Sequence, residues 1–400
     1  MAGIIEGPWR RDDLAGVKTA IALWGDRHIP ATVIAQQARA LESGGVDGML
    51  IADQFGNFIP PQLWKPEITP AAAVLPDPDS HSDPFTLAGY LLAAAPTLDV
   101  AVSTDSVRRG PSELVQAALT LANMTEGEVT LQVGGGEAKQ CAPFGYKRSQ
   151  GMSRMEDLFR IFGALLDSGG QPIDFEGRRW HYTGASIGGA VPHRPKIMGL
   201  GGGPILIDHS TSYADGLATT CPPVWTGPEE FGQAREQILK TVAAKGRNPE
   251  EFEFAVWFPC LIGNDRSQLE SKFDNPLIKW LAAVFGRIEP TDWDKIGLES
   301  PFPEGWRYYN DLLPHQTSDS LIDGVLGTVT DAHVTSGWVC GTPAEVAATI
   351  TEYVEAGASW VCPMDYLPMV LDPAEATSAF ERSIETVALI KQHSTAQTPV

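Results

Sequence analysis

Short apolar runs alternate with longer amphipathic runs along almost the whole chain, and this alternation constrains the fold more than any other feature. Runs of about five apolar residues are typical of buried strands, and apolar residues spaced three or four apart are typical of helices. Eight such strands, most of them followed by a helix, are the count of a closed barrel rather than an open sheet. We therefore predict α/β class and one (β/α)8 TIM barrel domain over residues 1–400. The predicted strands are 19–24, 48–52, 98–103, 129–133, 195–200, 216–220, 252–261 and 359–362, and the predicted helices are 31–43, 85–95, 111–124, 152–166, 228–244, 342–356 and 374–391.

Three stretches interrupt the alternation, and we predict that they are insertions after strands 2, 4 and 7 of the barrel. Residues 56–84 are rich in proline and aromatic residues and predict a long loop, and residues 171–193 predict a small hairpin. Residues 272–337 predict helices that cap the barrel as a lid, because long insertions in such folds usually form pocket walls. Residues 394–400 predict a disordered tail.

Composition and charge narrow the class of partner. The chain has 29 Lys plus Arg against 50 Asp plus Glu, a net charge of −21, which opposes binding to nucleic acid or to an anionic membrane surface. No segment predicts a membrane span or a secretion signal. The five cysteines form no CxxC pair and the eight histidines no metal-binding spacing, so we predict no metal site and a cytoplasmic location. A small-molecule substrate is the expected partner.

Two glycine clusters follow predicted strands, at 134–136 and 201–203. Glycine lets a backbone approach a planar ring or a phosphate closely, and a helix that begins after the second cluster would offer free N–H groups to an anion. The pair therefore indicates a phosphorylated cofactor with a ring system. Neither cluster is a GxGxxG or GxxxxGK[ST] motif, and glycines at strand ends are also ordinary turn residues.

Several short motifs occur in a fixed order along the chain. They are Ile51-Ala-Asp-Gln54, Val102-Ser-Thr-Asp105, Arg108-Arg-Gly-Pro-Ser-Glu-Leu-Val-Gln-Ala117, Val133-Gly-Gly-Gly-Glu137, Ala142-Pro-Phe-Gly145, Gly201-Gly-Gly-Pro204, Tyr213-Ala-Asp-Gly216, Gly246-Arg-Asn-Pro249 and Gly341-Thr-Pro-Ala-Glu-Val346. Their order resembles the luciferase-like barrel superfamily, and within it the oxidoreductases that use the deazaflavin coenzyme F420. The resemblance extends to the phthiodiolone-type ketoreductases.

The resemblance implies a deazaflavin over the carboxyl end of the barrel. It implies a bulge with a non-proline cis peptide at Ser103, Thr104 and Asp105, which supports the back of the ring. Cations near the cofactor tail would come from Arg108, Arg109, Lys139 and Lys147. The residues expected to contact the ring or the phosphate are Ser103, Thr104, Asp105, Gly135, Gly136, Gly201, Gly202, Gly203, Pro204 and Ile205.

The predicted catalytic residues are Asp53, Gln54 and Glu137. Gln54 stands where relatives often have histidine, and an amide cannot titrate, so the proton must come from elsewhere. Glu137 matches the glutamate that follows strand four in the family and is our candidate general acid, although it could also be a helix cap or a surface carboxylate. Trp24, Phe58 and Trp180 are candidates for the substrate wall, or for packing between lid and barrel.

We therefore expect an F420-dependent oxidoreductase that transfers a hydride between reduced deazaflavin and an organic carbonyl or activated alkene. The family also implies an F420-reducing enzyme as supplier of the cofactor, and a homodimer. The first alternative is an FMN-dependent two-component monooxygenase of the same superfamily. The second is a flavin-binding barrel without catalytic activity, which the replacement of histidine by Gln54 suggests.

Overall fold

A closed parallel barrel forms the centre of the protein, as the alternation of strands and helices predicts. The computed structural model describes residues 16–396. Eight strands pair in the order β1-β2-β3-β4-β7-β8-β9-β11, and β11 returns to β1. β10 adds to the end of β9, beyond the point where β8 stops. Their bounds are β1 Lys18–Ala22, β2 Gly48–Ala52, β3 Asp99–Asp105, β4 Val129–Gly134, β7 Lys196–Leu200, β8 Gly216–Thr220, β9 Glu253–Ile262, β10 Val339–Gly341 and β11 Trp360–Asp365.

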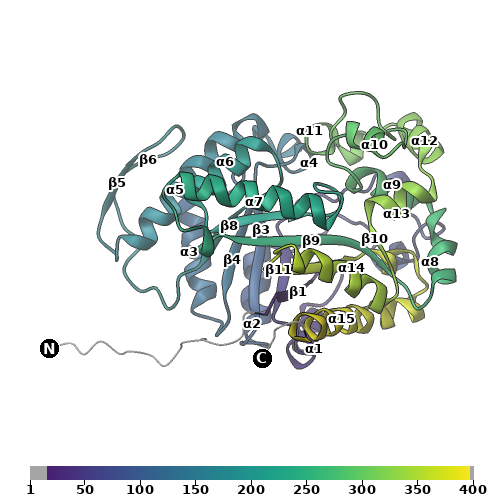
Figure 1. Ribbon diagram of the computed structural model, residues 1–400, viewed down its shortest axis with the longest axis horizontal. Coiled ribbons are helices and arrows are strands. Elements are labelled where there is room, and N and C mark those ends of the chain that lie inside the picture. Colours follow the sequence, from purple (N-terminus) through teal and green to yellow (C-terminus); the bar gives the residue numbers. More distant parts are fainter. Residues whose placement is uncertain (1–15, 397–400) are drawn as a thin grey trace.

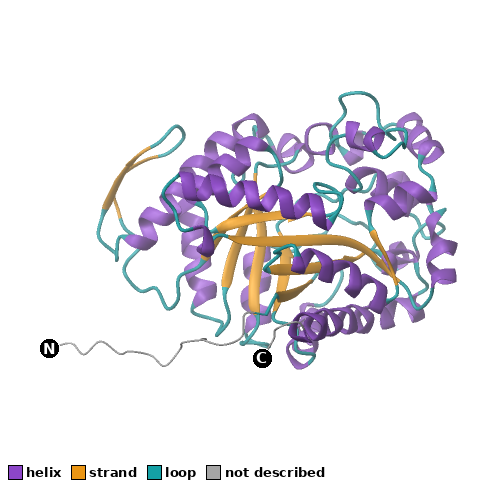
Figure 2. Cartoon of the chain, viewed as in Figure 1, coloured by secondary structure: helices purple, strands orange, loops and turns teal. Residues whose placement is uncertain are grey.

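Helices enclose the barrel (Figure 2). Most of them lie between consecutive strands, and their apolar faces pack on the outward side chains of the strands. Val100 and Val102 of β3, for example, share one apolar cluster with Leu114 and Phe159 of the surrounding helices. The helices between strands are α1 Ala31–Ser43, α2 Pro84–Leu92, α3 Pro111–Ala122, α4 Ala138–Cys141, α5 Gly151–Asp167, α6 Pro204–Tyr213, α7 Pro228–Ala244 and α14 Pro343–Glu355, and α15 Pro373–Ala396 follows the last strand. No helix within residues 16–396 is both long enough and apolar enough to cross a membrane.

The insertion after β9 is helical, as predicted, and it lies against one end of the barrel (Figure 1). Trp280 and Leu281 of α9 belong to the same apolar cluster as Ala20, Leu50 and Ala101, which come from three barrel strands. The insertion therefore shares an apolar core with the barrel. Its helices are α8 Arg266–Phe273, α9 Pro276–Phe285, α10 Thr291–Lys295, α11 Tyr308–Asp311, α12 Asp319–Thr328 and α13 Asp331–Gly337.

The insertion after β4 contains the predicted hairpin. β5 (Ile173–Glu176) pairs antiparallel with β6 (His181–Ala185), and the hairpin projects beyond the ring of helices (Figure 1). The predicted tail is wrong at its start, because α15 continues to Ala396; residues 397–400 lie outside the described part of the chain. The insertion after β2 has little regular structure beyond the short 3-10 helices Pro61–Leu63 and Pro70–Ala73.

The predicted bulge with a non-proline cis peptide in β3 is wrong. Ser103, Thr104 and Asp105 pair in unbroken parallel register with the last three residues of β4. The parallel pairing with β4 therefore extends to the end of the strand, and all three residues are buried. Within residues 16–396 the cis peptide bond is the one between Cys221 and Pro222, at the end of β8.

Candidate cofactor and active site

The second glycine cluster opens into a helix whose N-terminus is exposed. β7 ends at Leu200, and α6 begins at Pro204 with Gly203 as its N-cap residue and no side chain capping it. The first intrahelical bond runs from Ile207 N–H to Gly203 O at 3.0 Å, which leaves the N–H of Ile205 without a helical acceptor. Gly203 and Pro204 are exposed, and the Ile205 side chain is 56% exposed. This end of the helix therefore presents free donors and a positive dipole end to solvent.

The first glycine cluster lies beside the second, because β4 and β7 are neighbours in the barrel. A Cβ atom on Gly135 would approach Met152 Cε to 2.1 Å, and Gly136 has a φ of +85°. Gly151, the first residue of α5, also needs to be glycine, since its Cβ would lie 1.9 Å from the Gly135 carbonyl oxygen. The positive φ of Gly136 accounts for that glycine without a ligand, and the predicted contact of Gly135 and Gly136 with a cofactor stays a prediction.

Asp53 is held in a buried ion-pair cluster at the end of β2. Its carboxylate accepts hydrogen bonds from Thr104 Oγ1 at 2.7 Å, Arg109 Nε at 2.6 Å and Arg108 Nη1 at 3.3 Å. The side chains of Asp53 and Arg108 are 2% and 3% exposed. Arg108 also pairs with Asp105, whose other carboxylate oxygen accepts from the backbone at the start of the next loop. The two aspartates are thus paired with Arg108 and Arg109, and the Thr104 hydroxyl is bound to Asp53.

The cations predicted for the cofactor tail divide into two groups. Burial alone would lower the pKa of Arg108, but Asp105 and Asp53 outweigh it and raise that pKa, so Arg108 stays charged and engaged. Arg109 bridges Asp53 and Asp83, and Lys139 is buried against Glu137. Lys147 is exposed and has no carboxylate partner within the described residues. Of the four cations, Lys147 alone is available to an acidic tail.

Glu137 and Lys139 form a contact that links the end of β4 to the loop after β2. Lys139 Nζ lies 3.2 Å from Glu137 Oε2, donates to Gly56 O at 2.7 Å and sits 3.5 Å from the centroid of the Phe58 ring. Burial lowers the pKa of Lys139, and the Glu137 carboxylate partly offsets that effect. The Glu137 side chain is 27% exposed, and its Oε1 makes no hydrogen bond within residues 16–396. One carboxylate oxygen is therefore fixed and the other is available.

A continuous series of aromatic rings connects this pair to the end of β1. Trp24 lies 6.1 Å from Tyr366, Tyr366 lies 6.1 Å from Phe285, and Phe285 meets Phe58 at 4.4 Å between ring centroids. Tyr308 of α11 flanks both Phe58 and Phe285. Burial, with a further contribution from the Glu137 charge, raises the pKa of the Tyr308 phenol, and burial does the same for Tyr366. Trp24 and Phe58 therefore belong to one aromatic wall beside Glu137.

Gln54 and Trp180 occupy different surroundings. Gln54 is half-buried after β2, and its side chain makes no hydrogen bond within the described residues, so its amide is free to bind a ligand. Trp180 lies in the hairpin turn, where its backbone N–H donates to Asp157 Oδ2 and Arg154 stacks over its ring at 5.0 Å. These contacts with α5 place it apart from the aromatic wall.

Sequence reasoning placed Tyr308 among the candidate wall aromatics of the insertion, but it missed the contact of Tyr308 with Phe58, the ion pair of Lys139 and the role of Tyr366. Lys139 was expected to face a cofactor tail, yet it is buried two residues from the glutamate with which it pairs. Tyr308 reaches Phe58 from 250 residues further along the chain, and no local pattern records that contact. Tyr366 follows the last barrel strand directly, and an aromatic residue at the carboxyl end of a barrel strand was a usable signal.

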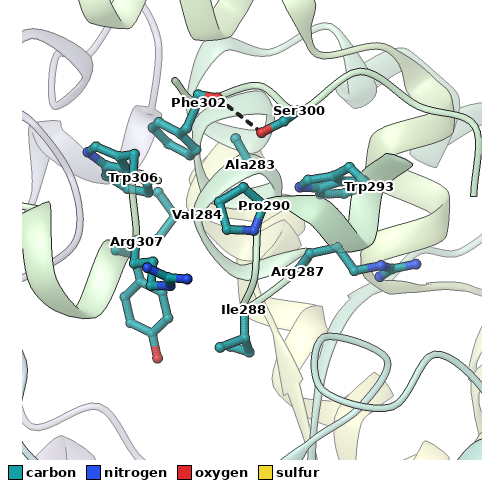
Figure 3. Close-up of a pocket in the computed structure, with 11 residues that line it drawn as sticks. Ala283, Val284, Arg287, Ile288, Pro290, Trp293, Ser300, Phe302, Trp306 and Arg307 are labelled. Atoms are coloured by element: carbon teal, nitrogen blue, oxygen red, sulfur yellow. Dashed lines mark hydrogen bonds between the residues drawn. The ribbon is translucent and has the colours of Figure 1, made fainter. Parts of the chain in front are cut away.

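Two cavities in the protein lie apart from Glu137, Gln54 and the glycine clusters, although Tyr308 lines the first of them. The first cavity lies inside the insertion, between Val284, Trp293 and the stacked rings of Phe302 and Trp306 (Figure 3). Its volume of about 10 Å³ accommodates at most one water molecule. The other, of about 200 Å³, lies at the amino ends of the strands. Its charged lining consists of the ion-paired residues Lys18, Asp99, Glu128, Lys196 and Glu253.

Comparison with known proteins identifies the family. Residues 15–359 match the family model of the luciferase-like monooxygenases. The chain belongs to the luciferase-like monooxygenase family. Members of this family are therefore the appropriate reference for its barrel and for the carboxyl edge described above.

Similar proteins include ketoreductases and a dehydrogenase. A phthiodiolone/phenolphthiodiolone dimycocerosates ketoreductase of Mycobacterium kansasii is 25% identical over 79% of this chain and 86% of its own. The protein of the same name from Mycobacterium sp. (strain JLS) is 27% identical over 81% of this chain and 83% of its own. An F420-dependent glucose-6-phosphate dehydrogenase of Mycobacterium avium (strain 104) is 28% identical over 52% of this chain and 58% of its own.

Solved structures confirm the luciferase-like fold. An F420-dependent secondary alcohol dehydrogenase in complex with an F420-acetone adduct superposes with a TM-score of 0.68, at 16% identity over 94% of this chain and 99% of that one. A coenzyme F420-dependent tetrahydromethanopterin reductase from Methanopyrus kandleri gives 0.67, at 16% identity over 95% and 99%. A long-chain alkane monooxygenase gives 0.61, at 16% identity over 93% and 91%. At these identities the likeness establishes the fold and not the reaction.

Proposed function

We propose that this protein is an F420-dependent oxidoreductase that transfers a hydride between reduced deazaflavin and an organic carbonyl or activated alkene. The observation that carries the proposal is the similarity in sequence, over four-fifths of the chain, to relatives named as ketoreductases. The assignment of F420 as the cofactor rests on a further relative that is named as F420-dependent and matches half of the chain.

The carboxyl edge of the barrel fits a cofactor with a phosphate group. The uncapped N-terminus of α6 would bind the phosphate through backbone N–H groups, with Gly201, Gly202 and Gly203 leaving room for its approach. Lys147 would pair with acidic groups of the tail. When bound, the deazaflavin supplies or accepts a hydride at a ring carbon.

The chain's own residues would serve the substrate. The Gln54 amide would donate to or accept from the substrate or the ring, and Glu137 would give a proton to the substrate oxygen or take one from it. The rings of Trp24, Phe58 and Tyr366 would cover this site and exclude water, which strengthens every polar contact inside it. Asp53 would act indirectly, by fixing the two arginines beneath the edge.

Fluorescence titration of the purified protein with F420 and, separately, with FMN tests the cofactor. We expect tight binding of F420 and weak binding of FMN. Oxidation of reduced F420 is then measured with a panel of ketones and enones. Binding of neither cofactor would refute the proposal. Turnover in a cell would also require a separate F420-reducing enzyme, and dimer formation is measurable by light scattering on the same sample.

FMN-dependent oxygenation is the second candidate, because the matching family model describes monooxygenases. The same helix N-terminus would bind the phosphate of FMN. Preference for FMN in the titration, with oxygen consumption when a reductase supplies reduced FMN, would favour this candidate over hydride transfer.

A further inference from the structure

The replacement of a titratable residue by Gln54 leaves Glu137 as the proton-transferring group of the proposed reaction, so the way in which Glu137 is held matters. Glu137 is the N-cap residue of α4, yet its carboxylate caps no backbone N–H of that helix. Its Oε2 instead faces Lys139 Nζ at 3.2 Å. The Glu137 carboxylate is therefore engaged by a side chain and not by the start of the helix.

Lys139 is fixed more firmly than a surface lysine. Its side chain is 2% exposed, and three neighbours occupy its ammonium: the Gly56 carbonyl, the Glu137 carboxylate and the face of Phe58. Gln140 holds the same loop from the adjacent position, since its amide accepts from Phe55 N at 2.6 Å and donates to Gly56 O at 3.0 Å. Lys139 is thus anchored on a loop that is itself anchored, and it offers one N–H to Glu137.

We propose that Lys139 is a positioning residue for Glu137: by binding Oε2 it turns the unpartnered Oε1 toward the substrate. This inference rests on the proposed function, because it assumes that Glu137 exchanges a proton with the substrate oxygen. In the reducing direction the Glu137 O–H bond breaks and an O–H bond forms on the product, while the substrate carbon gains its hydride from reduced deazaflavin. Lys139 does not contact the substrate and acts through Glu137.

The charge of Lys139 also enters the pH dependence. Burial lowers its pKa, so the ammonium is kept by its carboxylate and carbonyl partners and not by solvent. Several elements contribute the titratable groups that surround the pair. These groups are Glu137, Asp79, His81, Arg108, Arg148, Tyr308 and Tyr366.

A double-mutant cycle with Lys139→Met and Glu137→Gln tests the inference, with reduced F420 as cofactor and acetone and cyclohexanone as probe ketones. We expect Lys139→Met to lower kcat by about 10-fold or more with a smaller change in KM, and to have less than about a 2-fold effect when Glu137→Gln is already present. The midpoint of the kcat–pH profile should move upward in Lys139→Met, because a carboxyl that loses a neighbouring cation keeps its proton to higher pH. Additive effects in the cycle would overturn the inference.

Two controls separate positioning from other roles. Gln140→Leu loosens the loop but keeps the Lys139–Glu137 contact, so it should lower kcat less than Lys139→Met does. If Gln140→Leu reproduces the whole effect, Lys139 acts through the loop and the inference is wrong. Lys240→Met removes a lysine of α7 that is 71% exposed and should match the wild type.

A crystal structure of Lys139→Met without any ligand gives a readout that needs no substrate. We expect the Glu137 carboxylate to leave its position and Phe58 to keep its contact with Phe285. A Glu137 side chain that stays in place would refute the positioning role even if the variant is slow. Failure of the wild type to bind F420 would instead refute the proposed function, and the crystal structure would still decide whether Lys139 orients Glu137.

Discussion

Asparagine at position 53 should destabilise the fold by several kilocalories per mole. The Asp53 side chain is 2% exposed and accepts from Thr104, Arg108 and Arg109, of which Arg108 is 3% exposed. Removing one partner of a buried ion pair typically costs about 3–5 kcal/mol, since the other charge stays buried without compensation. Arg108 keeps its pair with Asp105, so we expect the lower end of that range, about 3 kcal/mol for Asp53→Asn.

Urea unfolding followed by tryptophan fluorescence measures this cost at constant slope. Asp83→Asn is the matched control, because Asp83 pairs with the same Arg109 but is 44% exposed. It also caps α2 by accepting from Thr86 N, which asparagine can do equally well. The control should lose less than about 1 kcal/mol. A loss in Asp53→Asn no larger than that in Asp83→Asn would show that the cluster is not the buried network described here.

Three further substitutions test other parts of the structure. Gly203→Asp should cap α6 and raise stability by about 0.5–1 kcal/mol. The same substitution should lower F420 affinity at least 10-fold in a fluorescence titration, because the new carboxylate competes for the N–H groups. The control Gly227→Asp, at the open N-cap of α7, should stabilise the protein without weakening F420 binding. Gly151→Ala should destabilise the protein by about 2 kcal/mol or more in urea unfolding, since the added Cβ meets a backbone oxygen. Gly163→Ala in the same helix should stabilise it by about 0.5–1 kcal/mol. Equal effects of the two substitutions would contradict the packing of α5. Burial raises the pKa of Asp365 to about 7, so the folded chain keeps a proton that the unfolded chain releases. The contribution of Asp365 to stability should therefore fall as pH rises from about 4 to about 7. In urea unfolding, Asp365→Asn should match the wild type at low pH and exceed it above pH 7, and parallel stability curves for the two proteins would refute the shift.

Local patterns were sufficient for the barrel and for most helix bounds. The strand predicted at 48–52 has the same bounds as β2, and the helix predicted at 31–43 has the same bounds as α1. Both follow from the sequence because period and length distinguish a buried strand from an amphipathic helix. The helix that follows Gly203 was also predictable, since Pro204 at its first position favours a helix start. The unbroken end of β3 was not predicted, because the predicted bulge came from the resemblance to a family and not from the residues themselves.

The sequence by itself determined the class of fold, the three insertions and the glycine-lined carboxyl edge, because these follow from periodicity and from backbone freedom at single positions. Only the tertiary structure decided which charges are available. The sequence does not distinguish four cations, Arg108, Arg109, Lys139 and Lys147, as candidates to bind an acidic group. In the structure the first three pair with carboxylates and Lys147 is exposed. The reason is physical: an ion pair depends on distance and burial, and these are set by contacts between residues far apart in the chain.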